Sequence, residues 1–218
     1  MDLTQLIEGF GGIIMIRDVC LDDAERLAEI YNYYIVNTHV LFDEKEISVD
    51  FMREKIRQVT EQGMPWLIAE NDTGEVLGFA CAKQWREKNA YRHTAELTIY
   101  LDPVIHKKGL GTKMFNELFK ELKSRSFNMV ISLITLPNEA SIALHEKFGM
   151  EKVAHFGEMG YKFDRWIDIG YWQGKLSEMD DHPEAVDPTM TQCSETSEAI
   201  DISDYPVAAN CADDLCNA

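Results

Sequence analysis

Residues 94–112 read TAELTIYLDPVIHKKGLGT. The segment His93–Leu101 is rich in β-branched and aromatic residues, which predicts a strand, and Asp102-Pro103 ends it. Gly109 and Gly111 follow, and from Leu110 onward apolar residues recur every fourth position, which predicts an amphipathic helix. The chain therefore runs from a strand through a glycine loop into a helix.

The sequence on both sides extends this alternation. Downstream, Val130–Leu136 predicts a strand, Asn138–Phe148 a helix ended by Gly149, and residues 151–173 two further strands. Upstream, the same spacing predicts strands at Ile13–Arg17, Trp66–Glu70 and Val76–Cys81, and helices that open at Asp22 and Ser48. Strand, helix, strand and helix in succession at the centre predict a parallel crossover inside a mixed sheet, an α/β fold.

Composition divides the 218 residues into three zones. Residues 1–12 are predicted to form a flexible leader, residues 13–176 a single folded domain, and residues 177–218 an acidic disordered tail. The tail holds eleven acidic residues and neither Lys nor Arg, so most of the net charge of −17 falls there. This charge argues against nucleic acid as a partner, because phosphate binding requires clustered cations.

The same sequence predicts a cytoplasmic protein without membrane attachment. Its longest apolar run, residues 10–16, is far shorter than the ~18 residues of a membrane span. The first ten residues contain no positive charge, unlike a secretory signal. Five cysteines, an odd number without a Cys-x-x-Cys pair, are typical of reduced thiols. The six histidines are scattered without ligand spacing, so no metal site is predicted.

The glycine loop has two interpretations. As a phosphate cradle, its glycines would let the backbone approach a pyrophosphate, and the first N–H groups of the helix would bind it. As a packing device, the glycines would only bring the helix close to its neighbours, and spacing alone does not separate the two. The residues at stake are His106, Lys107, Lys108, Gly109, Leu110, Gly111 and Thr112. Neither a P-loop nor a dinucleotide-binding glycine pattern is present.

Three motifs, in order, resemble one family. They are Thr94-Ala95-Glu96-Leu97-Thr98-Ile99-Tyr100-Leu101, Lys107-Lys108-Gly109-Leu110-Gly111 and Asn138-Glu139-Ala140-Ser141-Ile142-Ala143-Leu144-His145-Glu146. Together with residues 160–163 and 166–173, they resemble the GNAT superfamily of acetyl-CoA-dependent N-acetyltransferases, and more narrowly its phosphinothricin and methionine sulfoximine N-acetyltransferase branch. The resemblance covers residues 14–173 and implies the GNAT fold, a twisted, partly parallel sheet with helices on both faces.

The resemblance also implies roles at the reacting centre. Glu96 falls on the position of the catalytic base, although a Glu in a strand is by itself unremarkable. His145 is placed near the substrate or the leaving thiol, the alternative being a structural core histidine. The family implies that the backbone of Leu97, Thr98 and Ile99, the loop from His106 to Thr112, Asn138 and Ser141 bind acetyl-CoA. Asn138 is also a candidate helix cap. His106 departs from the family, which usually has Gln or Arg there.

The substrate side is predicted from the same resemblance. Arg86 and Lys88 correspond to the family's substrate segment and offer cations for a carboxylate, although a solvated loop explains both equally well. Thr94 is a further candidate for substrate binding. Tyr31, Phe42 and Tyr91 are candidates for an apolar wall, although aromatic residues at such spacing are more often core.

The predicted function is transfer of acetyl from acetyl-CoA to the amine of a small amino-acid-like substrate, such as phosphinothricin, methionine sulfoximine or methionine sulfone. Two alternatives stay open: an acetyltransferase for another amine, such as a protein N-terminus or a polyamine, and a non-catalytic acetyl-CoA-binding module. The family tendency implies a homodimer.

Overall fold

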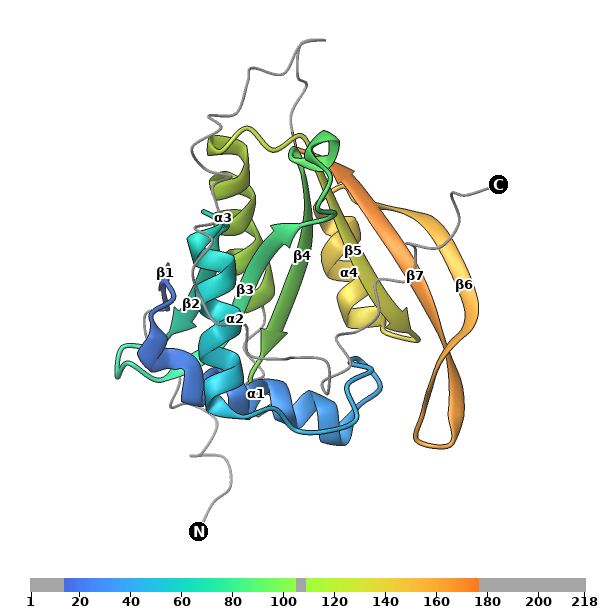
Figure 1. Ribbon diagram of the computed structural model, residues 1–218, viewed down its shortest axis with the longest axis horizontal. Helices are drawn as coiled ribbons and strands as arrows, with labels where there is room; N and C mark the ends of the chain where they lie inside the picture. The colour runs from blue at the N-terminus through green and yellow to red at the C-terminus, as the bar shows by residue number, and fades with distance from the viewer. Residues whose placement is uncertain (1–13, 105–108, 177–218) are drawn as a thin grey trace, which may run out of the picture.

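The computed structural model describes residues 14–104 and 109–176 (Figure 1). Its elements are, in order, β1 (Met15–Asp18), η2 (Leu21–Asp23), α1 (Ala24–Asn37), α2 (Val49–Glu61), β2 (Trp66–Glu70), β3 (Val76–Gln84), η3 (Asn89–Tyr91), β4 (Thr94–Leu101), α3 (Leu110–Ser124), β5 (Met129–Leu136), α4 (Glu139–Lys147), β6 (Glu151–Lys162) and β7 (Arg165–Lys175). The predicted leader and tail, and His106, Lys107 and Lys108 of the glycine loop, lie outside the described residues.

One mixed sheet of seven strands, in the order β1-β2-β3-β4-β5-β7-β6, carries the helices on both faces. α1 and α2 bury Leu27, Ile30 and Ile56 against one face of the sheet. α3 buries Met114, Phe115 and Leu118 against the other face, and α4 adds Ile142 and Leu144 at its edge. The predicted GNAT architecture, with helices on both faces of a partly parallel sheet, is confirmed.

Most predicted elements are present with shifted ends. Ser48 caps α2 as expected, since its side chain accepts a hydrogen bond from the amide of Phe51 at 3.1 Å. β3 extends past the predicted end at Cys81 to Gln84, because Lys83 and Gln84 pair with Glu96 and Ala95 on β4. Pairing with β4 sets this boundary, and the local sequence of β3 does not show that pairing.

The parallel crossover joins β4 to β5 through α3, as predicted. The two strands pair only at Thr94–Met129, Ala95–Val130 and Glu96–Ile131. Beyond Glu96 and Ile131 they diverge toward their carboxyl ends (Figure 1). We call this diverging part, residues 97–101 of β4 and 132–136 of β5, the β4–β5 fork. One edge of β4 is therefore left without a neighbouring strand there.

Candidate active site

The backbone of β4 directs alternate amides into the β4–β5 fork. Asp102 N donates to Leu77 O at 2.9 Å on the β3 side, whereas His93 O accepts from Met129 N at 3.1 Å on the β5 side. Because strand amides alternate between neighbours, the odd-numbered residues face β5, and the N–H groups of Leu97 and Ile99 point into the fork. Thr98 pairs with Cys81 and faces β3 instead. Two of the three predicted backbone positions thus offer donors to a ligand.

Glu96 stands at the base of the fork. Its side chain shares the sheet face covered by α1 and α2 with Tyr100, whereas Ala95 and Leu97 belong to the opposite core. The carboxylate is 19% exposed and lies 3.4 Å from the ammonium of Lys83, its cross-strand partner. Glu96 is thus partly buried but still accessible. It lies beside the edge of β4 whose N–H groups have no neighbouring strand.

The start of α3 borders the same fork. Gly109, its N-cap, has a φ of +89°, a left-handed conformation that suits glycine. Gly111 is buried, and a Cβ there would lie 3.2 Å from Leu144 of α4 and 3.7 Å from Ile99 of β4. Thr112 accepts a hydrogen bond from Lys147 of α4 at 3.2 Å. Close packing, the plainer of the two interpretations, is therefore present, and it brings the free amides of the helix start to the fork.

The start of α4 lies on the other side of the fork. Asn138 caps this helix, because its side-chain oxygen accepts from the amide of Ser141 at 3.2 Å. His145 is 3% exposed, its Nδ1 donates to the carbonyl of Ser141 at 2.7 Å, and its ring meets Phe115 edge-on. Burial lowers the pKa of His145. These contacts are those of a structural histidine, and its role near substrate stays a prediction.

The loop between β3 and β4 gathers around an aromatic residue that the sequence reasoning passed over. Trp85 donates its amide to Thr94 O at 3.1 Å, which ties the loop to the start of β4. The Arg86 guanidinium lies 5.1 Å from the centre of the Trp85 ring, and Tyr91 meets that ring edge-on. Lys88 is exposed at the start of η3. Of the predicted substrate residues, Arg86, Tyr91 and Thr94 thus lie together.

Phe42, another of the predicted substrate residues, contacts the β6–β7 hairpin. It lies in the loop between α1 and α2, and its ring packs against the backbone of Gly160 on β6. Lys162, 7% exposed, fixes the same loop by donating from Nζ to Ile35 O and Leu41 O, both at 2.7 Å. The β6–β7 hairpin therefore determines where Phe42 stands.

A second group of polar residues, which the sequence did not single out, covers the face that carries Glu96. Tyr31 of α1 donates its hydroxyl to Asp43 at 3.2 Å and accepts from Lys55 of α2 at 3.5 Å. Beneath them lies the buried Cys81 of β3, whose pKa burial raises to about 12. Of this group, the sequence pointed only to Tyr31, as a candidate wall residue on the apolar stripe of a predicted helix. The neighbours arise from the packing of α1 and α2 over the sheet.

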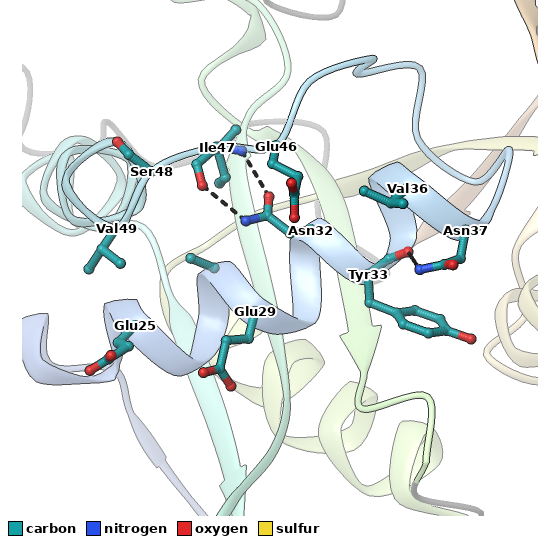
Figure 2. A pocket seen from close by; sticks show the side chains of 11 residues that line it. Glu25, Glu29, Asn32, Tyr33, Val36, Asn37, Glu46, Ile47, Ser48 and Val49 are labelled. Atoms are coloured by element: carbon teal, nitrogen blue, oxygen red, sulfur yellow. Dashed lines mark hydrogen bonds between the residues drawn. The ribbon is translucent and has the colours of Figure 1, made fainter.

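An open cavity of about 580 Å³ lies elsewhere, between α1 and the start of α2 (Figure 2). Glu25, Glu29 and Glu46 line it, and Asn32 closes one side through hydrogen bonds with both backbone groups of Ile47. None of the predicted site residues lines it. In residues 14–104 and 109–176, no group of three acidic, His or Cys side chains suits a metal ion. Within the same ranges, no helix combines the length and apolar character of a membrane span.

Comparison with known proteins identifies this arrangement. Residues 16–170 match the model of the acetyltransferase (GNAT) domain. The chain is 32% identical to the phosphinothricin N-acetyltransferase of Streptomyces viridochromogenes over 160 residues, which cover 73% of this chain and 86% of that protein. It is 31% identical to the L-amino acid N-acyltransferase of Escherichia coli over 164 residues, covering 75% and 94%.

A solved structure shows the same fold with its co-substrate bound. It is a GNAT superfamily phosphinothricin acetyltransferase from Sinorhizobium meliloti in complex with acetyl-CoA. Its TM-score with this chain is 0.77 at 31% identity, covering 80% of this chain and 96% of that one. The resemblance that the three motifs carry is confirmed, and the chain belongs to the GNAT family of N-acetyltransferases.

Proposed function

We propose that the chain acetylates the amine of a small amino-acid-like substrate, with Glu96 as the base. One observation carries this proposal: an accessible carboxylate stands where the β4–β5 fork opens, next to strand amides that have no neighbouring strand. The named functions of the relatives, phosphinothricin and L-amino acid acylation, support the substrate class.

The chemistry needs a neutral amine. An α-amino group has a pKa near 8, so at neutral pH most of the substrate is protonated and unreactive. The Glu96 carboxylate takes this proton, directly or through water, which frees the lone pair for attack on the acetyl carbonyl. The ammonium of Lys83 lies 3.4 Å from this carboxylate and forms a salt bridge with it.

The residues at the fork fit acetyl-CoA, which supplies the acetyl group as a reactive thioester. The amides of Leu97 and Ile99 offer donors to its carbonyl groups, as an added strand would use them. The start of α3, with Gly109 and Gly111, offers amides and the positive helix end to the pyrophosphate. Asn138 and Ser141 stand at the start of α4 on the far side. In the sequence, the glycine loop before α3 also includes His106, Lys107 and Lys108.

The first test measures release of free CoA from acetyl-CoA. The amine panel is phosphinothricin, methionine sulfoximine, methionine sulfone, common amino acids, a polyamine and a peptide with a free N-terminus. We expect turnover on the sulfone-like compounds, and a loss of kcat of roughly 10²–10⁴-fold in Glu96→Gln. Glu117→Gln, which removes an exposed carboxylate on α3, serves as the control and should retain activity.

The other outcomes decide between the alternatives. Turnover only on the polyamine or the peptide would replace the substrate class and keep the base. Binding of acetyl-CoA without turnover on any amine would favour a non-catalytic binding module. Full activity of Glu96→Gln would remove Glu96 from the mechanism.

We propose further that two copies of the chain form a homodimer through the β6–β7 hairpin. β6 is an edge strand, and the hairpin exposes Phe156, Met159, Tyr161 and Trp166, each at least 44% exposed. An apolar edge strand of this length invites pairing with a partner. Light scattering should give twice the 25.0 kDa chain mass. Trp166→Ser is expected to shift the mass toward 25.0 kDa, and a monomeric unmodified protein would refute the dimer.

A cytoplasmic location is also proposed. Cys20 and Cys81, the cysteines in the described part of the chain, both carry free thiols, which supports a reducing compartment. Cell fractionation tests this, and recovery outside the cytoplasm would overturn it.

A further inference from the structure

Lys55 is a half-buried cation that forms no salt bridge in the described part of the chain. Its ammonium lies 4.5 Å from the centre of the Tyr31 ring and 5.9 Å from that of Phe51, and it donates to the Tyr31 hydroxyl at 3.5 Å. Among the residues that the structure describes, no carboxylate forms a salt bridge with it. Partial withdrawal of an ammonium from water without an adjacent anion costs free energy, and a bound anion would offset that cost.

The neighbouring groups do not fill that place. Asp43 accepts a hydrogen bond from the Tyr31 hydroxyl, and its charge acts on Lys55 without forming a salt bridge with it. The Cys81 thiol has its pKa raised to about 12, mainly by burial, so it is neutral at pH 7 and supplies no charge. Burial lowers the pKa of Lys55 itself, the expected response of an ammonium that lacks an anion.

Lys55 and Glu96 lie on the same face of the sheet. The Lys55 ammonium contacts the ring of Tyr31, which meets the ring of Tyr100 on β4 edge-on with centroids 5.3 Å apart, and Tyr100 and Glu96 share one face of β4. The buried Cys81 belongs to the same core cluster as Tyr31. Cys81 and Lys83 are next-but-one neighbours on β3, and Lys83 pairs with Glu96 on β4. A cation from α2 and a carboxylate from β4 thus lie on one face of the sheet, and among the described residues Glu96 forms a salt bridge with Lys83 whereas Lys55 forms none.

An amino acid complements this pair of charges. Its amine is the group that reacts, and its acidic group needs a cation a few bonds away. We propose that Lys55 binds the acidic group of the substrate, a carboxylate or a phosphinate, while Glu96 receives the proton of its amine. Lys55 is then the residue that selects amino acids over simple amines. This inference rests on the proposed function.

Arg86 and Lys88 are the competing cations, and their surroundings differ from those of Lys55. The Arg86 guanidinium lies against the Trp85 ring, and Lys88 is exposed to water, where a charge gains little from an anion. Lys55 lies between aromatic rings on the face that carries Glu96, where a charge-assisted hydrogen bond is worth more.

The test compares an amino acid with its carboxamide, which differ only in the acidic group, and adds a substrate with a second acidic group. The KM and kcat of Lys55→Met and Lys55→Arg are measured with methionine sulfone, with its carboxamide, and with phosphinothricin, which carries a phosphinate besides its carboxylate. We expect Lys55→Met to raise the KM for methionine sulfone on the order of tenfold or more, with kcat and the KM for the carboxamide little changed. Lys55→Arg should restore most of the loss.

The matched control is Lys120→Met, which removes an exposed ammonium from α3 on the opposite face and should change none of these constants. A KM effect with phosphinothricin but not with methionine sulfone would assign Lys55 to the phosphinate, and an effect with both assigns it to the α-carboxylate. Equal rises in KM for the acid and the carboxamide would indicate a merely structural role and overturn the proposal.

Failure of the proposed function has a different signature, because unmodified protein would then turn over neither methionine sulfone nor phosphinothricin. Normal turnover with an unchanged KM in Lys55→Met overturns Lys55 alone. Where that variant does not fold, Lys55→Gln is compared in the same way. The unmodified protein adds an independent readout, since a KM for the carboxamide equal to that for the acid also overturns the proposal.

Discussion

The imidazole of His145 is held neutral by its surroundings. It is buried against Phe115, and its hydrogen bond to the carbonyl of Ser141 fixes the proton on Nδ1. Burial lowers its pKa, and the bond to Ser141 O only partly opposes this. A proton placed on Nε2 would put a charge into the core, so His145 resists titration in the folded state.

This resistance predicts a pH-dependent part of the stability. Since the folded pKa lies below the unfolded value of ~6.5, the unfolded chain binds the proton first as the pH falls. The contribution is present above that value and is lost as the pH falls below it. Urea unfolding at pH 7.5 and 5.5 should show a smaller loss for His145→Gln than for unmodified protein. Identical losses would contradict the neutral assignment.

Glu96 and Lys55 show which residues a sequence can and cannot point to. A Glu in the middle of a strand is ordinary, and only the family motif marked it. Nothing marked Lys83 or Lys55, because a lysine is compatible with any exposed position of a strand or helix. Their proximity depends on the β3–β4 register and on how α2 lies across the sheet, both of which are set by packing between distant segments.

At the scale of elements, periodicity predicted the strands and the helix that build the fork. Apolar spacing is local, so it located β4, α3 and β5 and implied their parallel crossover. It could not give the place where β4 and β5 part, because that depends on how α3 and α4 wedge against the sheet. Gly111 stands at that wedge, between Leu144 of α4 and Ile99 of β4.

A larger side chain at Gly111 should therefore disturb the co-substrate side of the site. In Gly111→Val the branched carbons press on Leu144 and Ile99, which should cost roughly 1–3 kcal/mol in the free energy of unfolding. The displaced helix start should raise the KM for acetyl-CoA more than the KM for the amine. Asn116→Val places the same side chain on the exposed face of α3 as a control. An unchanged KM for acetyl-CoA in Gly111→Val would separate this helix start from binding.

At the scale of the whole molecule, the C-terminal end of the domain is an interior part of the sheet. β7 lies between β5 and β6, although it is the last strand in sequence. Its final residues are paired, Gly174 with Val130 and Lys175 with Met129. Leu176 is 4% exposed in the main core, and its amide donates to Asn128 O at 2.8 Å. The chain through Leu176 therefore contributes to the stability of the domain.

This arrangement predicts a sharp boundary for truncation. A chain that stops after Leu176 should keep the kcat/KM and the Tm of the full chain, since every contact described here is retained. A chain that stops after Gln173 loses the burial of Leu176 and two strand pairs, and should be less stable by at least about 2 kcal/mol. For a domain of this size, that lowers Tm by roughly 4–8 °C. Thermal unfolding and CoA release of the three chains check both expectations.

Loss of activity on stopping after Leu176 would show that residues 177–218 act in catalysis. Equal Tm values for the two truncated chains would contradict the anchoring role of Leu176.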